Sequence, residues 1–154
     1  MQPAPFIVKI PPPIWTFAML IIAYGLQQTF TLAALPVAQS AIASVFLVAA
    51  GLALAFWAER NFAAAGTEIM PASPANKTLV TEGPFRFTRN PMYLGLMTAT
   101  LGVAVFFGTL AFFAVPALLF LLVNFVFVPF EEAKMARQFG TQYTEYCARV
   151  RRWL

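Results

Sequence analysis

The sequence has no histidine, a single cysteine and few charged side chains, and each shortage excludes a class of chemistry. Without histidine, this chain cannot supply a Ser-His-Asp triad, a histidine-ligated zinc site or a histidine general base. Cys147 alone cannot form an intrachain disulfide or a metal site built from several cysteines. Any chemistry must therefore use carboxylates, arginines, tyrosines, backbone groups or a bound cofactor.

Charge is scarce because the sequence is largely apolar. Only 10% of the residues are charged, against roughly 25% in an ordinary soluble domain. Hydrophobic residues make up 60% of the chain, and the mean hydropathy is +0.74. The two long tracts 10–58 and 90–130 carry no charge at all. Each is about long enough for two membrane-spanning helices, at roughly 20 residues per helix.

We therefore predict an all-α, polytopic membrane protein that forms a single membrane domain, residues 1–154. Four transmembrane helices, arranged as two hairpins, would be followed by an amphipathic C-terminal helix. The predicted spans cover about residues 14–35, 40–57, 91–107 and 110–130, with a loop at 59–90 and a C-terminal helical segment at 131–154. Neither apolar tract alternates polar and apolar residues as a transmembrane strand would.

The positions of the basic residues predict the orientation. Lysine and arginine near span ends are retained on the cytoplasmic side, and both predicted hairpin turns are uncharged. We therefore expect an integral protein of the cytoplasmic (inner) membrane with its N-terminus, central loop and C-terminus in the cytoplasm. The net charge of +4 is explained by this orientation and by anionic headgroups. Nucleic-acid binding is not expected, because the basic residues flank spans instead of forming one basic face.

The C-terminal segment has the periodicity of an amphipathic helix. Apolar side chains recur at intervals of three or four, which predicts one apolar stripe beside a charged face. The stripe consists of Met135, Phe139, Tyr143, Tyr146, Val150 and Trp153. Gly140 is expected to divide this helix into two pieces. A helix lying on the membrane surface would show the same pattern, so the stripe alone does not indicate a site.

Two clusters of opposite charge flank the second predicted hairpin. Glu131 and Glu132 follow the fourth span, where carboxylates need a cationic partner or a polar ligand. Arg86 and Arg89 precede the third span, on the same side of the membrane. Because the far turn is short, the two clusters should be neighbours. This leaves two interpretations open, a structural salt-bridge cluster and a site for a zwitterionic or multiply polar ligand, approached by a lipophilic partner from the bilayer.

Two blocks of sequence carry these charges. They read LVTEGPFRFTRNPMYLG (Leu79–Gly95) and EEAKMARQFGTQYTEYCARVRRW (Glu131–Trp153). In order, spacing and membrane placement they resemble the isoprenylcysteine carboxyl methyltransferase and phospholipid methyltransferase family, over about the C-terminal half of the chain. The resemblance implies an integral membrane enzyme that binds S-adenosylmethionine at the cytoplasmic end of the second hairpin. Asn90 departs from the commoner histidine, and Arg151 stands where the family often has proline.

The resemblance assigns cofactor contacts by position. Those residues are Arg89, Asn90, Pro91 and Tyr93 of an arginine-histidine-proline-x-tyrosine motif, the paired Glu131 and Glu132, and Tyr143, Tyr146 and Arg149 of a tyrosine and arginine pattern. Arg86 or Arg89 would pair with the cofactor carboxylate through the guanidinium fork. Glu131 or Glu132 would accept hydrogen bonds from the ribose hydroxyls or the amino group. The expected catalytic residues are Glu131, Glu132 and Arg149.

The expected reaction is S-adenosylmethionine-dependent methyl transfer to a lipophilic acceptor at the cytoplasmic membrane interface. The acceptor group is a carboxylate, thiol, amine or phenol, and the missing histidine favours one that is already ionised. The expected partners are a lipophilic small-molecule or lipid substrate and membrane lipids, with no metal. Two alternatives stay open, an NADPH-dependent membrane reductase related to the sterol reductases and a non-enzymatic membrane scaffold that binds anionic lipid.

Overall fold

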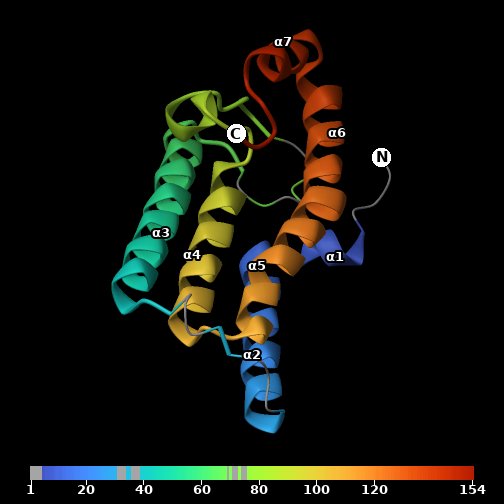
Figure 1. The fold of residues 1–154 in the computed structure, drawn as a ribbon. Helices are drawn as coiled ribbons and strands as arrows, with labels where there is room; N and C mark the ends of the chain where they lie inside the picture. Colours follow the sequence, from blue (N-terminus) through green and yellow to red (C-terminus); the bar gives the residue numbers. More distant parts are fainter. Residues whose placement is uncertain (1–4, 31–33, 36–38, 69, 71–72, 74–75) are drawn as a thin grey trace.

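The structure is a computed structural model of the chain that describes residues 5–30, 34–35, 39–68, 70, 73 and 76–154. Within these ranges the regular structure is helical (Figure 1), apart from one isolated β-bridge between Ala34 and Thr109. The predicted all-α class is therefore confirmed.

The helices follow one another along the chain in a simple order. They are α1 (Phe6–Lys9), α2 (Pro12–Thr29), α3 (Ala41–Ala64), α4 (Pro91–Phe107), α5 (Leu110–Leu122), α6 (Val128–Phe139) and α7 (Thr141–Arg149). A 3₁₀-helical turn, η2 (Gly83–Arg86), precedes α4. A π-helical turn, η3 (Val123–Phe127), joins α5 to α6. The segment from Leu110 to Phe139 is therefore one continuous helix.

Two of the described helices are long and apolar enough to cross a bilayer. The helix α3 has 24 residues and the continuous helix 110–139 has 30, and the mean hydropathy over an 18-residue stretch of each is 2.2 and 2.6. The helix α4 is apolar but has only 17 residues. Length and composition thus support two spans, and the four-span arrangement stays a prediction.

The helix α4 has the bounds that the sequence predicts. Pro91 stands at its first position, where the missing N–H group has no intrahelical partner to lose. Gly108 ends it with a φ of 62°, in the left-handed region that glycine adopts without steric cost. These two residues define the helix independently of its apolar content.

The bounds of α2 and α3 differ from the predicted spans. The helix α2 ends at Thr29 and Phe30 is extended, whereas the first span was expected to reach about residue 35. Residues 31–33 lie outside the described part of the chain. The helix α3 continues to Ala64 instead of stopping near residue 57, because charged residues at a span end do not interrupt helical hydrogen bonding.

The helices do not pack as two hairpins. The helix α3 packs mainly against α4, α4 against α5, and α2 against α5, so α3 and α2 lie on opposite sides of the α4–α5 pair (Figure 1). The predicted first hairpin is therefore wrong as a pair of packed neighbours. Apolar surface alone does not choose a partner for a helix in lipid; close backbone fit does.

Glycines provide that fit between α3 and α4. A Cβ atom on Gly95 would lie 2.5 Å from the carbonyl oxygen of Gly51 and 2.8 Å from the backbone nitrogen of Ala55. A Cβ atom on Gly102 would lie 2.8 Å from Val48 Cγ2. The two backbones approach closely only because these side chains are absent, as in other helix pairs within membranes.

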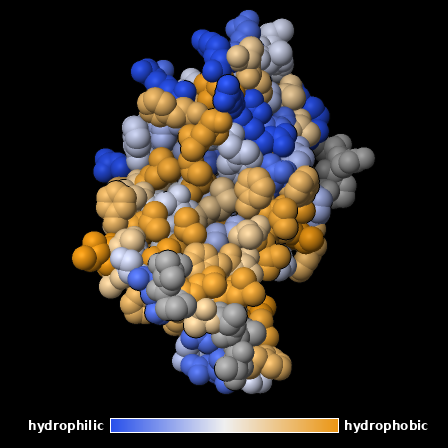
Figure 2. All heavy atoms as spheres, viewed as in Figure 1, coloured by the Kyte–Doolittle hydropathy of each residue, from blue (hydrophilic) through white to orange (hydrophobic). Residues whose placement is uncertain are grey.

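The surface matches a protein that contacts lipid. Figure 2 shows hydrophobic residues over most of the helical body, with the largest group of hydrophilic residues at the end that carries α7 and a smaller group at the opposite tip. Large apolar side chains on α2 and α3, among them Phe17, Ile21, Ile42 and Phe46, are exposed. Exposed apolar surface of this extent marks contact with lipid or protein.

The C-terminal segment is helical only in part. Gly140, with a φ of 49°, separates α6 from α7 as predicted. The helix α7 ends at Arg149, and Val150 is extended. The predicted helical segment therefore stops five residues before residue 154, and the apolar stripe does not continue along a helix to Trp153.

Candidate functional site

A cavity of about 630 Å³ lies where both charged clusters meet. Its walls come from the α1–α2 junction, one face of α3, the connection before α4, the first turns of α4, and α6 and α7. Cavities of roughly 300–1,000 Å³ accommodate small molecules and cofactors.

The structure brings most of the predicted site residues together here. Arg89, Asn90, Pro91, Tyr93, Glu131, Glu132, Tyr143 and Tyr146 all line the cavity. Two others do not line it in the described part of the chain. Arg86 is exposed and pairs with Glu82, and Arg149 is exposed on α7. The two sequence blocks thus form one site, without these two arginines.

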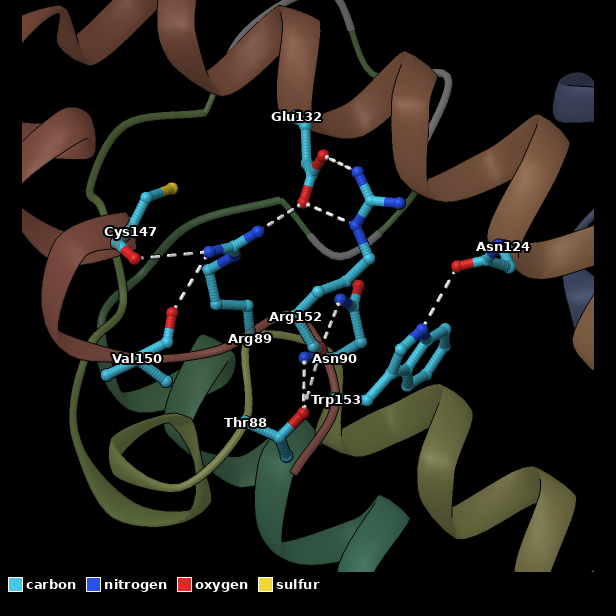
Figure 3. Close-up of polar contacts among 9 residues, drawn as sticks. All are labelled: Thr88, Arg89, Asn90, Asn124, Glu132, Cys147, Val150, Arg152 and Trp153. Atoms are coloured by element: carbon cyan, nitrogen blue, oxygen red, sulfur yellow. Dashed lines mark hydrogen bonds and ion pairs between the residues drawn. The ribbon is translucent and has the colours of Figure 1, made fainter.

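Glu132 stands between two guanidinium groups (Figure 3). Its Oε1 accepts hydrogen bonds from Arg89 Nη2 at 2.7 Å and from Arg152 Nε at 3.0 Å, and its Oε2 accepts one from Arg152 Nη2 at 2.5 Å. The Arg89 and Glu132 side chains are only 15% and 22% exposed. Charge-assisted hydrogen bonds in such a shielded place are among the stronger polar contacts.

The guanidinium group of Arg89 stays protonated in this environment. Burial acts to lower its pKa, but the hydrogen bond and the negative charge of Glu132 outweigh burial, and the pKa of Arg89 is raised. Its Nη1 donates to the carbonyl oxygens of Val150, at 3.0 Å, and Cys147, at 3.4 Å. Its buried Nε has no hydrogen-bond partner among the described residues. An unsatisfied buried donor costs about 1–3 kcal/mol, which a ligand acceptor would recover.

Glu131 faces a different partner. The hydroxyl of Tyr93 donates to Glu131 Oε1 at 2.5 Å, and the Tyr93 ring packs edge-on against Phe127. This contact joins the first turn of α4 to α6. The adjacent glutamates therefore play different parts, since Glu132 binds the protein's own arginines and Glu131 binds a neutral hydroxyl.

Lys134 adds a second cation to the cavity wall. It is buried, and its Nζ donates to the carbonyl oxygen of Ser73 at 3.3 Å. It lies one helical turn after Glu131 and so shares a face of α6 with that residue. Both signs of charge are thus present on one wall, as a zwitterionic ligand requires.

The connection before α4 is tied to α6 through Asn76. The backbone nitrogen of Asn76 donates to Gln138 Oε1 at 3.0 Å, Gln138 Nε2 donates back to the Asn76 carbonyl at 3.3 Å, and Asn76 Nδ2 donates to Glu68 at 2.8 Å. The bond to the Glu68 backbone carbonyl fixes the orientation of the Asn76 side-chain amide. Asn76 Oδ1 is buried and lacks a partner in the described chain, and Asn76 lines the cavity.

Tyr143 and Tyr146 close the site from α7. Both are buried and pack with Leu79, Met135 and Phe139, and the Tyr146 hydroxyl donates to the carbonyl oxygen of Phe85 at 2.8 Å. Burial raises the pKa of Tyr143 and of Tyr146. Both phenols are therefore protonated at neutral pH and serve as walls and donors.

Comparison with known proteins agrees with this geometry. A model of the phospholipid methyltransferase family matches residues 39–142, more than half of the chain. The chain belongs to this family. No match was found among curated proteins or among solved structures. Family membership and the apolar helices together point to a methyltransferase that resides in a membrane.

The family match covers the α3–α6 part of the site and ends just before Tyr143. The sequence analysis missed four residues that shape the site, namely Asn76, Asn124, Lys134 and Arg152. Lys134 had a usable signal, because it lies three residues after Glu131 on a predicted helix. Asn76 and Arg152 had none, since each lies on a non-helical segment whose path is not encoded in any periodicity. Asn124 had none either, since its amide oxygen accepts a hydrogen bond from Trp153 Nε1 on the same segment as Arg152.

Proposed function

We propose that this phospholipid methyltransferase family member transfers a methyl group from S-adenosylmethionine to a lipophilic acceptor. One observation carries the proposal: the two sequence blocks meet in a single cavity that combines Arg89, Glu131 and Lys134 with an apolar wall. Family membership supports the same reaction class.

The residues fit the cofactor's chemistry. S-adenosylmethionine presents a carboxylate, which suits the unsatisfied Nε–H of Arg89. Its amino and hydroxyl donors suit the carboxylate of Glu131 and the unsatisfied Oδ1 of Asn76. When bound, the cofactor supplies a methyl carbon already activated by a sulfonium group. The chain would bind and orient it between Arg89 and Glu131, under Tyr143 and Tyr146.

The acceptor would enter through the apolar wall. On α3, Leu52 and Phe56 line the cavity although they are 56% and 59% exposed, so this wall reaches the lipid-facing surface. Met92 and Leu96 continue it along α4, and Pro11–Pro13 stand at the α1–α2 junction. A lipophilic molecule can therefore place its polar end in the cavity while its chain stays in lipid.

The residues of this chain would align the cofactor with the acceptor, desolvate the nucleophile and, where needed, remove its proton. Holding the two reactants in a fixed relative orientation replaces an encounter in solution. The largely apolar lining would reduce the contact of the nucleophile with water. An ionised acceptor would need no base. An amine or phenol would lose its proton to Glu131, whose carboxylate is held by Tyr93. Arg86 and Arg149 are left out of this set because they lie outside the cavity.

Methyl transfer can be measured directly. The purified protein in lipid vesicles is given S-adenosylmethionine with a labelled methyl group, and label is counted in the organic extract. Arg89→Lys keeps the charge but loses the guanidinium fork, so transfer should fall at least ten-fold. Arg137→Lys, at an exposed position on α6, is the matched control and should transfer normally. No label transfer by folded wild-type protein, across vesicles with and without added acceptor lipids, would contradict the proposal.

A further inference from the structure

The last residues of the chain form a strap over the start of the arginine motif. We define this strap as Val150–Trp153, which follows α7 and is not helical. Its backbone carbonyls accept four hydrogen bonds from Thr88, Arg89 and Asn90. Arg89 Nη1 donates to Val150 O at 3.0 Å, Arg89 N to Arg151 O at 3.0 Å, Thr88 Oγ1 to Arg152 O at 3.0 Å, and Asn90 Nδ2 to Arg152 O at 2.9 Å. The strap therefore holds the segment that carries Arg89.

Trp153 anchors the far end of the strap. Its Nε1 donates to Asn124 Oδ1 at 3.0 Å (Figure 3). The centroid of its ring lies 5.5 Å from the centroid of the Phe120 ring. It also packs against the buried cluster of Leu119, Val123 and Val128. Asn124 is a polar amide inside an otherwise apolar helix, where an unpaired polar group is costly. The indole N–H removes that cost and fixes the tail.

Asn124 lies in the π-helical turn η3. The N–H of Val128 donates to the carbonyl of Val123, five residues back instead of four. The extra residue in this turn rotates everything downstream by about 100°, the angle per residue of an α-helix. The same turn therefore sets the direction of Glu132, on α6, relative to that of Asn124. Turns of this kind often occur at functional sites.

The strap also determines which hydrogen bonds Arg89 makes to Glu132. Arg152 holds Glu132 through both Nε and Nη2, whereas Arg89 reaches it through Nη2 alone. A carboxylate without Arg152 is free to take the fork of Arg89, including its Nε. The anchored strap thus leaves the Arg89 Nε–H without an acceptor among the described residues.

We propose that Trp153 and Asn124 are positioning residues that latch the strap, so that Arg152 occupies Glu132 and Arg89 is left to bind the cofactor carboxylate. Neither residue is among the described residues that line the cavity, and Trp153 lies beyond the family match. The inference rests on the proposed function, because it names a residue pair that prepares the same site.

A double-mutant cycle tests the latch in the full chain. Trp153→Phe keeps a ring against Phe120 and removes the N–H, and Asn124→Leu removes the acceptor. Calorimetry with S-adenosylhomocysteine should show about a five-fold weaker affinity for each variant, the size expected for one neutral hydrogen bond. The double variant should lose little more, because both changes break the same contact. Trp57→Phe, at an exposed position on α3, is the matched control.

A second ligand separates positioning from general damage. 5′-Methylthioadenosine has the adenosine part but no carboxylate, so the latch variants should bind it as the wild type does. Equal weakening for both ligands would overturn the proposal, because it would indicate a purely structural role. Unchanged S-adenosylhomocysteine affinity in both variants would overturn it while leaving the methyltransferase function standing. No binding by wild-type protein would remove the proposed function, and the latch with it.

The latch also has a readout in the ligand-free protein. Trypsin cleavage after Arg152 requires the strap to leave its place, so Trp153→Phe and Asn124→Leu should both be cleaved several-fold faster than the wild type. Equal cleavage rates would overturn the anchoring role of Trp153.

Discussion

At the residue scale, Glu132 is the contact on which the polar end of the site depends. Glu132→Gln keeps the shape of the side chain but leaves Arg89 and Arg152 without their shared negative charge. Unfolding in detergent should become easier by about 2 kcal/mol, the size of a lost charge-assisted hydrogen bond, and cofactor affinity should fall at least ten-fold.

Glu82→Gln is the matched control for that change. Glu82 pairs with Arg86 at the exposed surface, where ion pairs contribute about 0–1 kcal/mol. Differential scanning fluorimetry on both variants compares them under one condition. An equally small shift for Glu132→Gln would show that its two arginines are held without it.

The buried tyrosines predict a pH dependence. Because burial raises the pKa of Tyr143 and Tyr146 in the folded state, both phenols lose their protons more easily in the unfolded chain. Their contribution to stability is complete below the unfolded value, about 10, and is lost as the pH rises above it. Stability measured up to pH 11 should therefore fall more steeply in the wild type than in Tyr146→Phe. Parallel curves would contradict the assigned burial.

Much of the site could be predicted at this scale, for an identifiable reason. Arg89, Tyr93, Glu131 and Glu132 flank uncharged tracts, and charge beside hydrocarbon is costly enough to mark a site. The same reasoning also named Arg86, which the structure places at the surface beside Glu82, since adjacency in sequence does not fix the direction of a side chain on a 3₁₀-helical turn.

At the element scale, the close contact between α3 and α4 depends on glycines, which have no side chain. Gly95→Ala would place a methyl group against the backbone of Gly51 and Ala55, and forcing extra volume into a tight interface costs about 1–3 kcal/mol. Because α4 carries Tyr93, methyl transfer should fall as well. The measurements are thermal stability and transfer rate in detergent.

Gly25→Ala provides the control for that prediction. Gly25 also lies within an apolar helix, α2, but a Cβ there meets nothing within 4 Å. The substitution should leave stability unchanged or raise it, because alanine favours a helix more than glycine does. Similar losses at the two positions would show that helix propensity, not close packing, decides the result.

The elements themselves were only partly predictable. Pro91 and Gly108 mark the ends of α4 by local chemistry, so its bounds could be read directly. The pairing of α2 with α5 could not, because apolar helices carry no periodic signal for a partner. The end of α7 at Arg149 was missed because Val150 and Trp153 happen to continue the helical spacing, although Val150 is extended and Trp153 packs on the α5–α6 helix.

At the scale of the whole molecule, the predicted topology puts the start of α3 on the outer side of the membrane. The end of α3 and the helix α7 would both lie on the cytoplasmic side. In a Cys147→Ser background, Ser40→Cys would mark the start of α3 and Glu145→Cys the helix α7, both at exposed positions. A membrane-impermeant thiol reagent should label Ser40→Cys in intact cells. It should label Glu145→Cys only after the membrane is opened. Labelling of both from the same side would contradict the four-span arrangement.

The central claim is that the cavity between α4, α6 and α7 binds S-adenosylmethionine. Isothermal calorimetry of the purified protein with S-adenosylmethionine, S-adenosylhomocysteine and NADPH tests it most directly. The account predicts saturable binding of the first two, no binding of NADPH, and loss of binding in a folded Glu131→Ala/Glu132→Ala variant. Binding of NADPH alone, or cofactor affinity retained by that variant, would contradict it.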